Sequence, residues 1–143
     1  MAPVGAWAAA SGAIDWAPWI LFLIVFLWTP PHFWALAMYC KDDYVRARLP
    51  MMPVVKGDRS TLNQILGYSI ALVLSSFAPA LVGAGPLYIT ASVLLGISFL
   101  YRAIRARREN TVPALKSLFG HSILYLFGLF IALVLDVLLA RLW

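Results

Sequence analysis

Four long apolar stretches dominate this chain and leave it few ways to fold. They cover about residues 16–39, 63–82, 85–104 and 118–140, and each is long enough to cross the hydrocarbon core of a bilayer. Of the 143 residues, 63% are hydrophobic and 12% are charged, so too few polar side chains exist to cover a water-facing surface. The sequence predicts an all-α membrane protein with about four transmembrane helices, in a single transmembrane domain over residues 1–143.

The basic residues gather in two of the segments that separate these stretches. Neither the segment before Trp16 nor the turn at 83–86 contains any. Five follow the first stretch (Lys41, Arg46, Arg48, Lys56, Arg59), five follow the third (Arg102, Arg105, Arg107, Arg108, Lys116), and Arg141 is in the tail. The positive-inside rule then predicts a multi-pass protein with both basic segments in the cytoplasm and both termini outside. Because the basic residues set the topology, they indicate the lipid bilayer and not a nucleic acid as the partner.

The second and third stretches are joined by residues 82–86, with the sequence VGAGP. Glycine can adopt the left-handed conformation that ends a helix, and proline favours the first turn of the next one, so a tight turn is expected here. Ser75 and Ser76, at the end of the second stretch, are expected to bond to carbonyls of their own helix.

The first stretch contains two adjacent prolines, in the heptapeptide WTPPHFW at residues 28–34. Two prolines remove two backbone donors and restrict the residues before them, so an uninterrupted helix through Thr29–Pro31 is not expected. His32 follows directly. An ionisable residue within a membrane span is a functional candidate by default. The simpler alternative, a hydrogen bond from His32 to a neighbouring helix, stays open.

Helical spacing from His32 leads to Leu36, Tyr39 and Asp43, which predicts one face carrying an imidazole, a phenol and a carboxylate. Asp43 is preceded by Asp42. Two neighbouring carboxylates at a membrane rim are suited to Mg²⁺, which usually bridges to phosphates. Nearby cations could neutralise such phosphates: Lys41, Arg46, Arg48 and Lys56. The alternative is a solvated loop whose charges only set topology, and composition alone does not decide between the two.

The fourth stretch also places polar and small residues on one face. Gly128 and Ala132 form a small-xxx-small pair, which is typical of close helix packing. Arg141 is a candidate partner for Asp136. The full set on this face is His121, Tyr125, Gly128, Ala132 and Asp136.

Two segments carry a resemblance to a known family: WTPPHFWALA at 28–37 and KDDYVRARLPMMPVV at 41–55. They resemble the protoheme IX farnesyltransferases (haem O synthases), a branch of the UbiA-type intramembrane prenyltransferases. The resemblance extends from Pro3–Trp7 to Asp136, and it matches only the C-terminal half of the family. It implies that this chain is part of a larger UbiA-type helical bundle in the inner (plasma) membrane of the cell.

The resemblance also implies a reaction and a set of site residues. The family transfers a farnesyl group from farnesyl diphosphate to a vinyl group of haem B, giving haem O, with Mg²⁺ bound to the diphosphate. By this resemblance Asp42 and Asp43 would hold the metal, and Asp43 and His32 would be catalytic. The residues expected to contact substrate are Lys41, Tyr44, Arg46, Lys56 and Tyr39.

The chain departs from the family in two places. The family's first aspartate-rich motif has no counterpart among the six acidic residues here, so the chain alone is expected to be inactive without a missing N-terminal half, from the same gene or a separate chain. Arg48 stands where the family more often has glycine or a small residue. A different hypothesis is a non-catalytic four-span protein that binds haem or assists oxidase assembly. A related prenyltransferase with a quinone-type acceptor is disfavoured by the WTPPHFW string.

Overall fold

The computed structural model describes Gly5, Ala9 and residues 16–142, with the side chains of residues 141 and 142 left out. Within these residues the chain is helical and no strand is found. The elements are α2 (Trp16–Tyr39), α3 (Lys41–Arg46), α4 (Met52–Lys56), α5 (Asp58–Ser75), the 3₁₀ helix η1 (Ala78–Val82), α6 (Pro86–Glu109) and α7 (Val112–Leu142). Four segments are long and apolar enough to cross a membrane, namely Trp16–Tyr39, Asp58–Val82, Pro86–Glu109 and Val112–Ala140. The predicted fold class is therefore confirmed.

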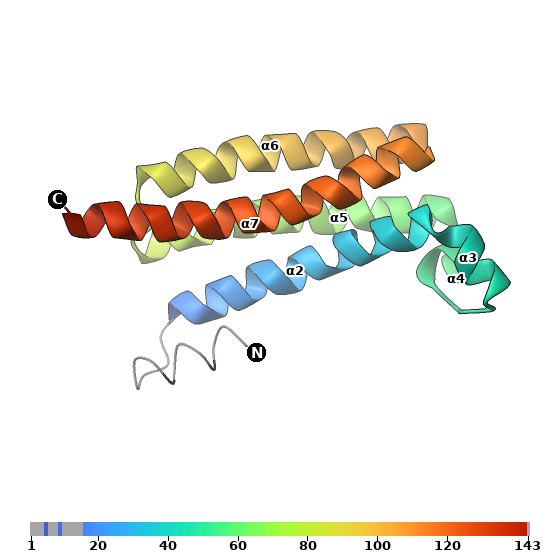
Figure 1. Ribbon diagram of the computed structural model, residues 1–143, viewed down its shortest axis with the longest axis horizontal. Helices are drawn as coiled ribbons and strands as arrows, with labels where there is room; N and C mark the ends of the chain where they lie inside the picture. Colours follow the sequence, from blue (N-terminus) through green and yellow to red (C-terminus); the bar gives the residue numbers. More distant parts are fainter. Residues whose placement is uncertain (1–4, 6–8, 10–15, 143) are drawn as a thin grey trace.

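The four long helices form an up-and-down bundle (Figure 1). Helix α2 packs on α5 and α7, and α6 packs on the same two helices, so each long helix has two antiparallel neighbours. The short helices α3 and α4 lie at the end of the bundle where α2 ends, and the α6–α7 turn lies at that same end (Figure 1). Both basic segments are thus brought to one end of the molecule, which we call the basic end.

The turn between η1 and α6 forms as the glycines and the proline predict. Gly83 has a φ of 101° and ends η1 in the left-handed conformation, and Pro86 is the first residue of α6. Ser75 and Ser76 both donate to the carbonyl of Leu72, at 2.8 and 2.9 Å, which confirms the expected bonds within their own helix.

Small residues let the helices approach closely. A Cβ at Gly96 would lie 2.8 Å from Val73 Cγ1, and one at Gly128 would lie 2.9 Å from Leu95 Cδ1. Gly128, one member of the small pair predicted on the fourth stretch, therefore has a packing role against α6.

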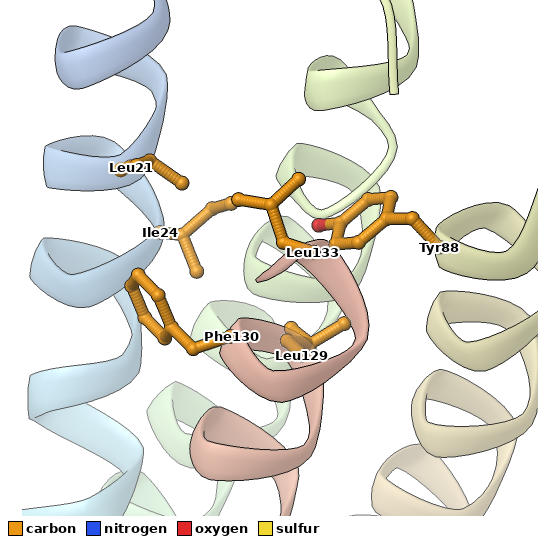
Figure 2. A pocket seen from close by; sticks show the side chains of 6 residues that line it. All are labelled: Leu21, Ile24, Tyr88, Leu129, Phe130 and Leu133. Atoms are coloured by element: carbon orange, nitrogen blue, oxygen red, sulfur yellow. The ribbon is translucent and has the colours of Figure 1, made fainter. Parts of the chain in front are cut away.

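Side chains fill the interior of the bundle. A cavity between α2, α6 and α7 has a volume of only about 10 Å³, which is room for one water at most. Figure 2 shows the side chains that close it: Leu21, Ile24, Tyr88, Leu129, Phe130 and Leu133. No chamber for a large substrate exists at this point of the core.

The expected break in the first span is wrong, because α2 is one helix through Pro30 and Pro31. The prolines leave the carbonyls of Phe26 and Leu27 without their usual amide donors. The Thr29 hydroxyl donates to the carbonyl of Val25 at 2.8 Å, so it does not satisfy either of the two freed carbonyls. Burial of Pro31 against the neighbouring helices favours the continuous helix, because an open segment in a span would leave further backbone groups unpaired.

The polar face of α7 points into the bundle, as its spacing predicts. Tyr125 is fully buried and its hydroxyl lies 2.6 Å from Ser76 Oγ on α5. His121 Nε2 lies 2.8 Å from Ser98 Oγ on α6. Asp136 bonds to the backbone at the start of α6, whereas the side chain of its expected partner, Arg141, lies outside the described residues.

Candidate functional site

Helix α3 carries the aspartate pair, and it is separated from α2 by a change of direction at Cys40. This residue has φ −97° and ψ 21°, and its carbonyl accepts from the amides of Asp43 and Tyr44 at the start of α3. The single helical face predicted to run from His32 to Asp43 is therefore wrong: it ends at Tyr39, where α2 ends. The chain turns along the bundle end because α2 has reached the end of its apolar stretch.

The end of α3 is a Schellman motif. The amide of Arg48 donates to the carbonyl of Val45 at 3.1 Å, and the amide of Leu49 donates to that of Tyr44 at 3.0 Å. Arg48 occupies the left-handed position of this motif with a φ of 53°. Glycine is the usual residue at such a position, and this explains why the resembled family favours a small residue there.

Asp42 and Asp43 are both exposed on α3. Among the described residues the ion pairs are Lys41–Asp58 and Arg105–Glu109, so neither of these two carboxylates is engaged in one. No group of three or more His, Cys, Asp or Glu side chains in the described part of the chain is arranged to hold a metal ion. The pair fits one side of a site in which a diphosphate and further ligands complete the coordination of Mg²⁺.

The expected substrate-binding cations differ in their surroundings. Lys41 Nζ lies 2.7 Å from Asp58 Oδ1, which ties the start of α3 to the start of α5. Arg46 and Lys56 are exposed at the ends of α3 and α4. Of these three cations, Arg46 and Lys56 make no ion pair within the described residues, whereas Lys41 already has a carboxylate partner.

The two tyrosines also differ. Tyr44 is half-buried on α3. Tyr39 is half-buried at the end of α2, and Lys116 Nζ lies 5.6 Å from the centre of its ring in a cation–π contact. This contact joins α2 to the start of α7 and occupies one face of the Tyr39 ring.

His32 lies in a cluster of aromatic rings between α2 and α7. Its ring stacks on Trp28 at a centroid distance of 4.3 Å and on Phe119 at 4.7 Å, with interplanar angles of 21° and 26°. His32 Nδ1 lies 2.7 Å from Ser122 Oγ, and Trp28 Nε1 donates to the carbonyl of Ser122 at 2.7 Å. The hydrogen bond to a neighbouring helix, left open as the simpler alternative, is present.

His32 and the aspartate pair lie at different depths. Seven residues of α2 separate His32 from Tyr39, which is roughly 10 Å along the helix axis. The structure therefore brings the charged residues of α3 and α4 together at the basic end but does not bring His32 into contact with them.

Two partners in this region were missed by the sequence reasoning, Ser122 and Asp58. A serine inside an apolar stretch is too common to indicate a partner for a histidine 90 residues away. Asp58 carried a weak signal, because a carboxylate in the first turn of a helix is favoured there.

Two large grooves in the described part of the chain lie far from α3. Grooves of about 570 and 460 Å³ follow the start of α6 and the second half of α7, at the end of the bundle opposite the basic end. Aliphatic side chains line most of both grooves. They suit lipid or another helix better than charged chemistry.

Comparison with known proteins identifies relatives along almost the whole chain. The model of the UbiA prenyltransferase family matches residues 1–134. A protein named protoheme IX farnesyltransferase from Nitrobacter hamburgensis is 50% identical over 95% of this chain and 45% of its own length. Proteins of the same name from Brucella anthropi and Symbiobacterium thermophilum are each 46% identical, over 97% and 94% of this chain and 46% of their own lengths. The chain thus spans about half the length of these relatives. No solved structure matches it.

Proposed function

Because the chain belongs to the UbiA prenyltransferase family, we propose that it provides the C-terminal half of a protoheme IX farnesyltransferase. In this reaction a farnesyl group passes from farnesyl diphosphate to a vinyl group of haem B, giving haem O. The observation that supports the proposal best is the identity of 46–50% with relatives of that name over nearly the whole chain. The resemblance of residues 28–37 and 41–55 agrees with it.

The exposed carboxylates of α3 supply the chemistry at the basic end. Asp42 and Asp43 would hold Mg²⁺ together with the diphosphate, and the bound cation would stabilise the negative charge that develops on the leaving diphosphate. Arg46 and Lys56, both exposed, would neutralise the remaining phosphate charge. Lys41, fixed by Asp58, would present its ammonium group from a constant position.

The second part of the proposal assigns a substrate-binding role to the aromatic cluster around His32. It lies within the span, roughly 10 Å deeper than the end of α2, where a long apolar chain and a porphyrin would meet the bundle. His32 would contact the haem or the allylic cation that forms when diphosphate leaves. The stacked rings of Trp28 and Phe119 would fix the imidazole against rotation.

Two observations support the proposal that this chain alone is inactive. The core cavity between α2, α6 and α7, at about 10 Å³, cannot hold a farnesyl chain, and the larger grooves lie at the end of the bundle opposite the aspartate pair. The chain contains one aspartate pair at the basic end, whereas the resembled family uses two aspartate-rich motifs. We therefore place the active site between this bundle and the missing N-terminal half, in the inner membrane, with the basic end in the cytoplasm.

The test is reconstitution from two chains. This chain is expressed in membranes lacking haem O synthase, alone and together with the N-terminal half of the Nitrobacter hamburgensis relative, and haem O is measured by chromatography. We expect haem O only when both chains are present. Haem O formation by this chain alone would contradict the two-part site. Absence of product from both samples, with haem B bound by this chain independently of Mg²⁺ and diphosphate, would support the non-catalytic haem-binding hypothesis instead.

A further inference from the structure

The hydrogen bonds around Ser122 determine which nitrogen of His32 carries the proton. Ser122 Oγ lies 2.6 Å from the carbonyl oxygen of Phe119 and 2.7 Å from His32 Nδ1. A carbonyl oxygen accepts and cannot donate, so the single hydroxyl proton of Ser122 is directed to Phe119. The bond to the imidazole then requires a proton on Nδ1, which donates to Ser122 Oγ.

From this chain of bonds we infer that Ser122 is a positioning residue that holds His32 in the Nδ1–H tautomer, with an unprotonated lone pair on Nε2. Such a nitrogen accepts a proton or binds a metal ion, and it does not donate a hydrogen bond. The partner that Nε2 of His32 can bind is therefore a hydrogen-bond donor or a metal ion. The catalytic meaning of this inference rests on the proposed function, whereas the tautomer itself does not.

The surroundings of the imidazole restrict how a partner can reach it. Trp28 and Phe119 both stack nearly parallel to the ring, at 4.3 and 4.7 Å, and two rings cannot share one face at these distances. Both faces are covered, and Ser122 occupies the Nδ1 edge. Phe33 stands nearly perpendicular to the imidazole at a centroid distance of 5.6 Å, so the approach left to a partner of Nε2 is in the ring plane.

Ser122 is itself held firmly, which makes it suited to this role. Its side chain is 1% exposed, and its own carbonyl accepts from Trp28 Nε1 at 2.7 Å. Since that second bond uses the backbone, removing the hydroxyl leaves the contact between α2 and α7 in place. A substitution of Ser122 therefore tests the tautomer more than the fold.

The test is nitrogen NMR of the whole chain in lipid nanodiscs, with isotope-labelled histidine, at about pH 8 where an ordinary imidazole is neutral. His121→Gln leaves His32 as the single histidine. We expect a protonated Nδ1 and an unprotonated Nε2. In Ser122→Ala this signature should be lost, whereas Ser122→Thr, which keeps the hydroxyl, should retain it. A protonated Nε2 in the chain with Ser122 intact would overturn the inference, and this result does not depend on whether the Ala variant folds. An unchanged spectrum in a folded Ser122→Ala variant would also overturn it.

The control is Ser69→Ala. Ser69 is also fully buried, but within the described residues its hydroxyl bonds only to the carbonyl of Ile65 in its own helix, at 2.7 Å, so its loss should leave the His32 spectrum unchanged. In the two-chain assay, Ser122→Ala should lower kcat by roughly tenfold or more with little change in KM for farnesyl diphosphate, and Ser122→Thr should restore it. The NMR spectrum can be recorded without any enzymatic activity. If the expected tautomer is found but the two chains form no haem O, the proposed function is refuted and the inference about the tautomer stands.

Discussion

The carboxylate of Asp136 on α7 accepts a hydrogen bond from the backbone amide of Gly85, 51 positions earlier in the chain. Its second oxygen accepts from the amide of Tyr88 at 3.3 Å. Gly85 and Tyr88 are the N-cap and third residue of α6, so one carboxylate from another helix satisfies the two amides that a capping box would otherwise satisfy. Asp136 is 7% exposed, which strengthens its effect on the positive end of α6.

Replacing Asp136 should destabilise the bundle. Asp136→Ala leaves two amides at the start of α6 unpaired, and we expect it to lower the free energy of unfolding by about 1–2 kcal/mol. Asp136→Asn keeps an acceptor oxygen and should cost less. Unfolding in a mild detergent, followed by circular dichroism, measures both. Equal stability of the wild type and the Ala variant would contradict the capping role.

Replacing Arg48 should stabilise α3. Arg48→Gly removes the strain of a side chain at φ 53° and is expected to raise the free energy of unfolding by up to about 1 kcal/mol. Arg48→Ala removes the same charge without relieving the strain, so it should not stabilise the protein. Both variants lose the charge of Arg48, so a difference between their free energies of unfolding reports the backbone strain alone. If the two variants unfold at the same temperature, the Schellman motif does not determine the stability of this end.

Neutralising Asp43 should abolish haem O formation in the two-chain assay. Asp43→Asn keeps the size of the side chain but removes the charge that a Mg²⁺ ligand needs. Glu109→Gln is the matched control, because Glu109 is also an exposed acidic residue at the basic end, and its ion pair in the described part of the chain is with Arg105 of its own helix. Full activity of Asp43→Asn would remove this residue from the metal site.

Substitutions of Lys41 and Asp58 should have different effects, one on substrate binding and the other on protein stability. The ion pair is about one-third exposed on both sides, so Asp58→Asn should change the free energy of unfolding by less than about 1 kcal/mol. Lys41→Met removes a charge-assisted contact to the diphosphate and should raise KM for farnesyl diphosphate by roughly tenfold. Steady-state kinetics of the two-chain enzyme measure this change. A KM unaffected by Lys41→Met would assign the lysine a structural role only.

Reporter fusions test the orientation in the membrane. A reporter inserted at Gly57, between α4 and α5, should be cytoplasmic, and one at the C-terminus should be outside, because the two positions lie at opposite ends of the bundle. A reporter active only in the cytoplasm, fused at each position in turn, distinguishes them. Signals from the same side would contradict the predicted topology.

The sequence was sufficient for the helical class, the number of long apolar helices and the turn at Gly83, because hydropathy and glycine or proline chemistry act locally. It failed at Pro30 and Pro31, where the local preference of proline is opposed by the burial of Pro31 against neighbouring helices. It also failed beyond Tyr39, because the direction of the chain there depends on how α3 and α4 meet the end of the bundle.

In the candidate site, too, some features could be predicted from the sequence and others could not. The residue types of α3 and the exposure of Asp42 and Asp43 follow from a charged segment at the end of an apolar stretch. The partners Ser122 and Asp58 depend on the register between helices, which no spacing within one helix contains. His32 was therefore found by its residue type, whereas the tautomer that decides its chemistry needed the distance to Ser122.

The short connection between α6 and α7 has a consequence for how the two helices meet lipid. Asn110, with a φ of 47°, caps α6 and α7 begins at Val112, so the two helices are held antiparallel from the turn onward. Their polar side chains meet each other, Ser98 with His121 and Arg102 with Ser117. The two bonds satisfy polar atoms of both helices within the hairpin, although the buried Nε of Arg102 has no hydrogen-bond partner among the described residues. In a bilayer such a hairpin therefore exposes fewer unpaired polar groups to lipid than two separate helices would.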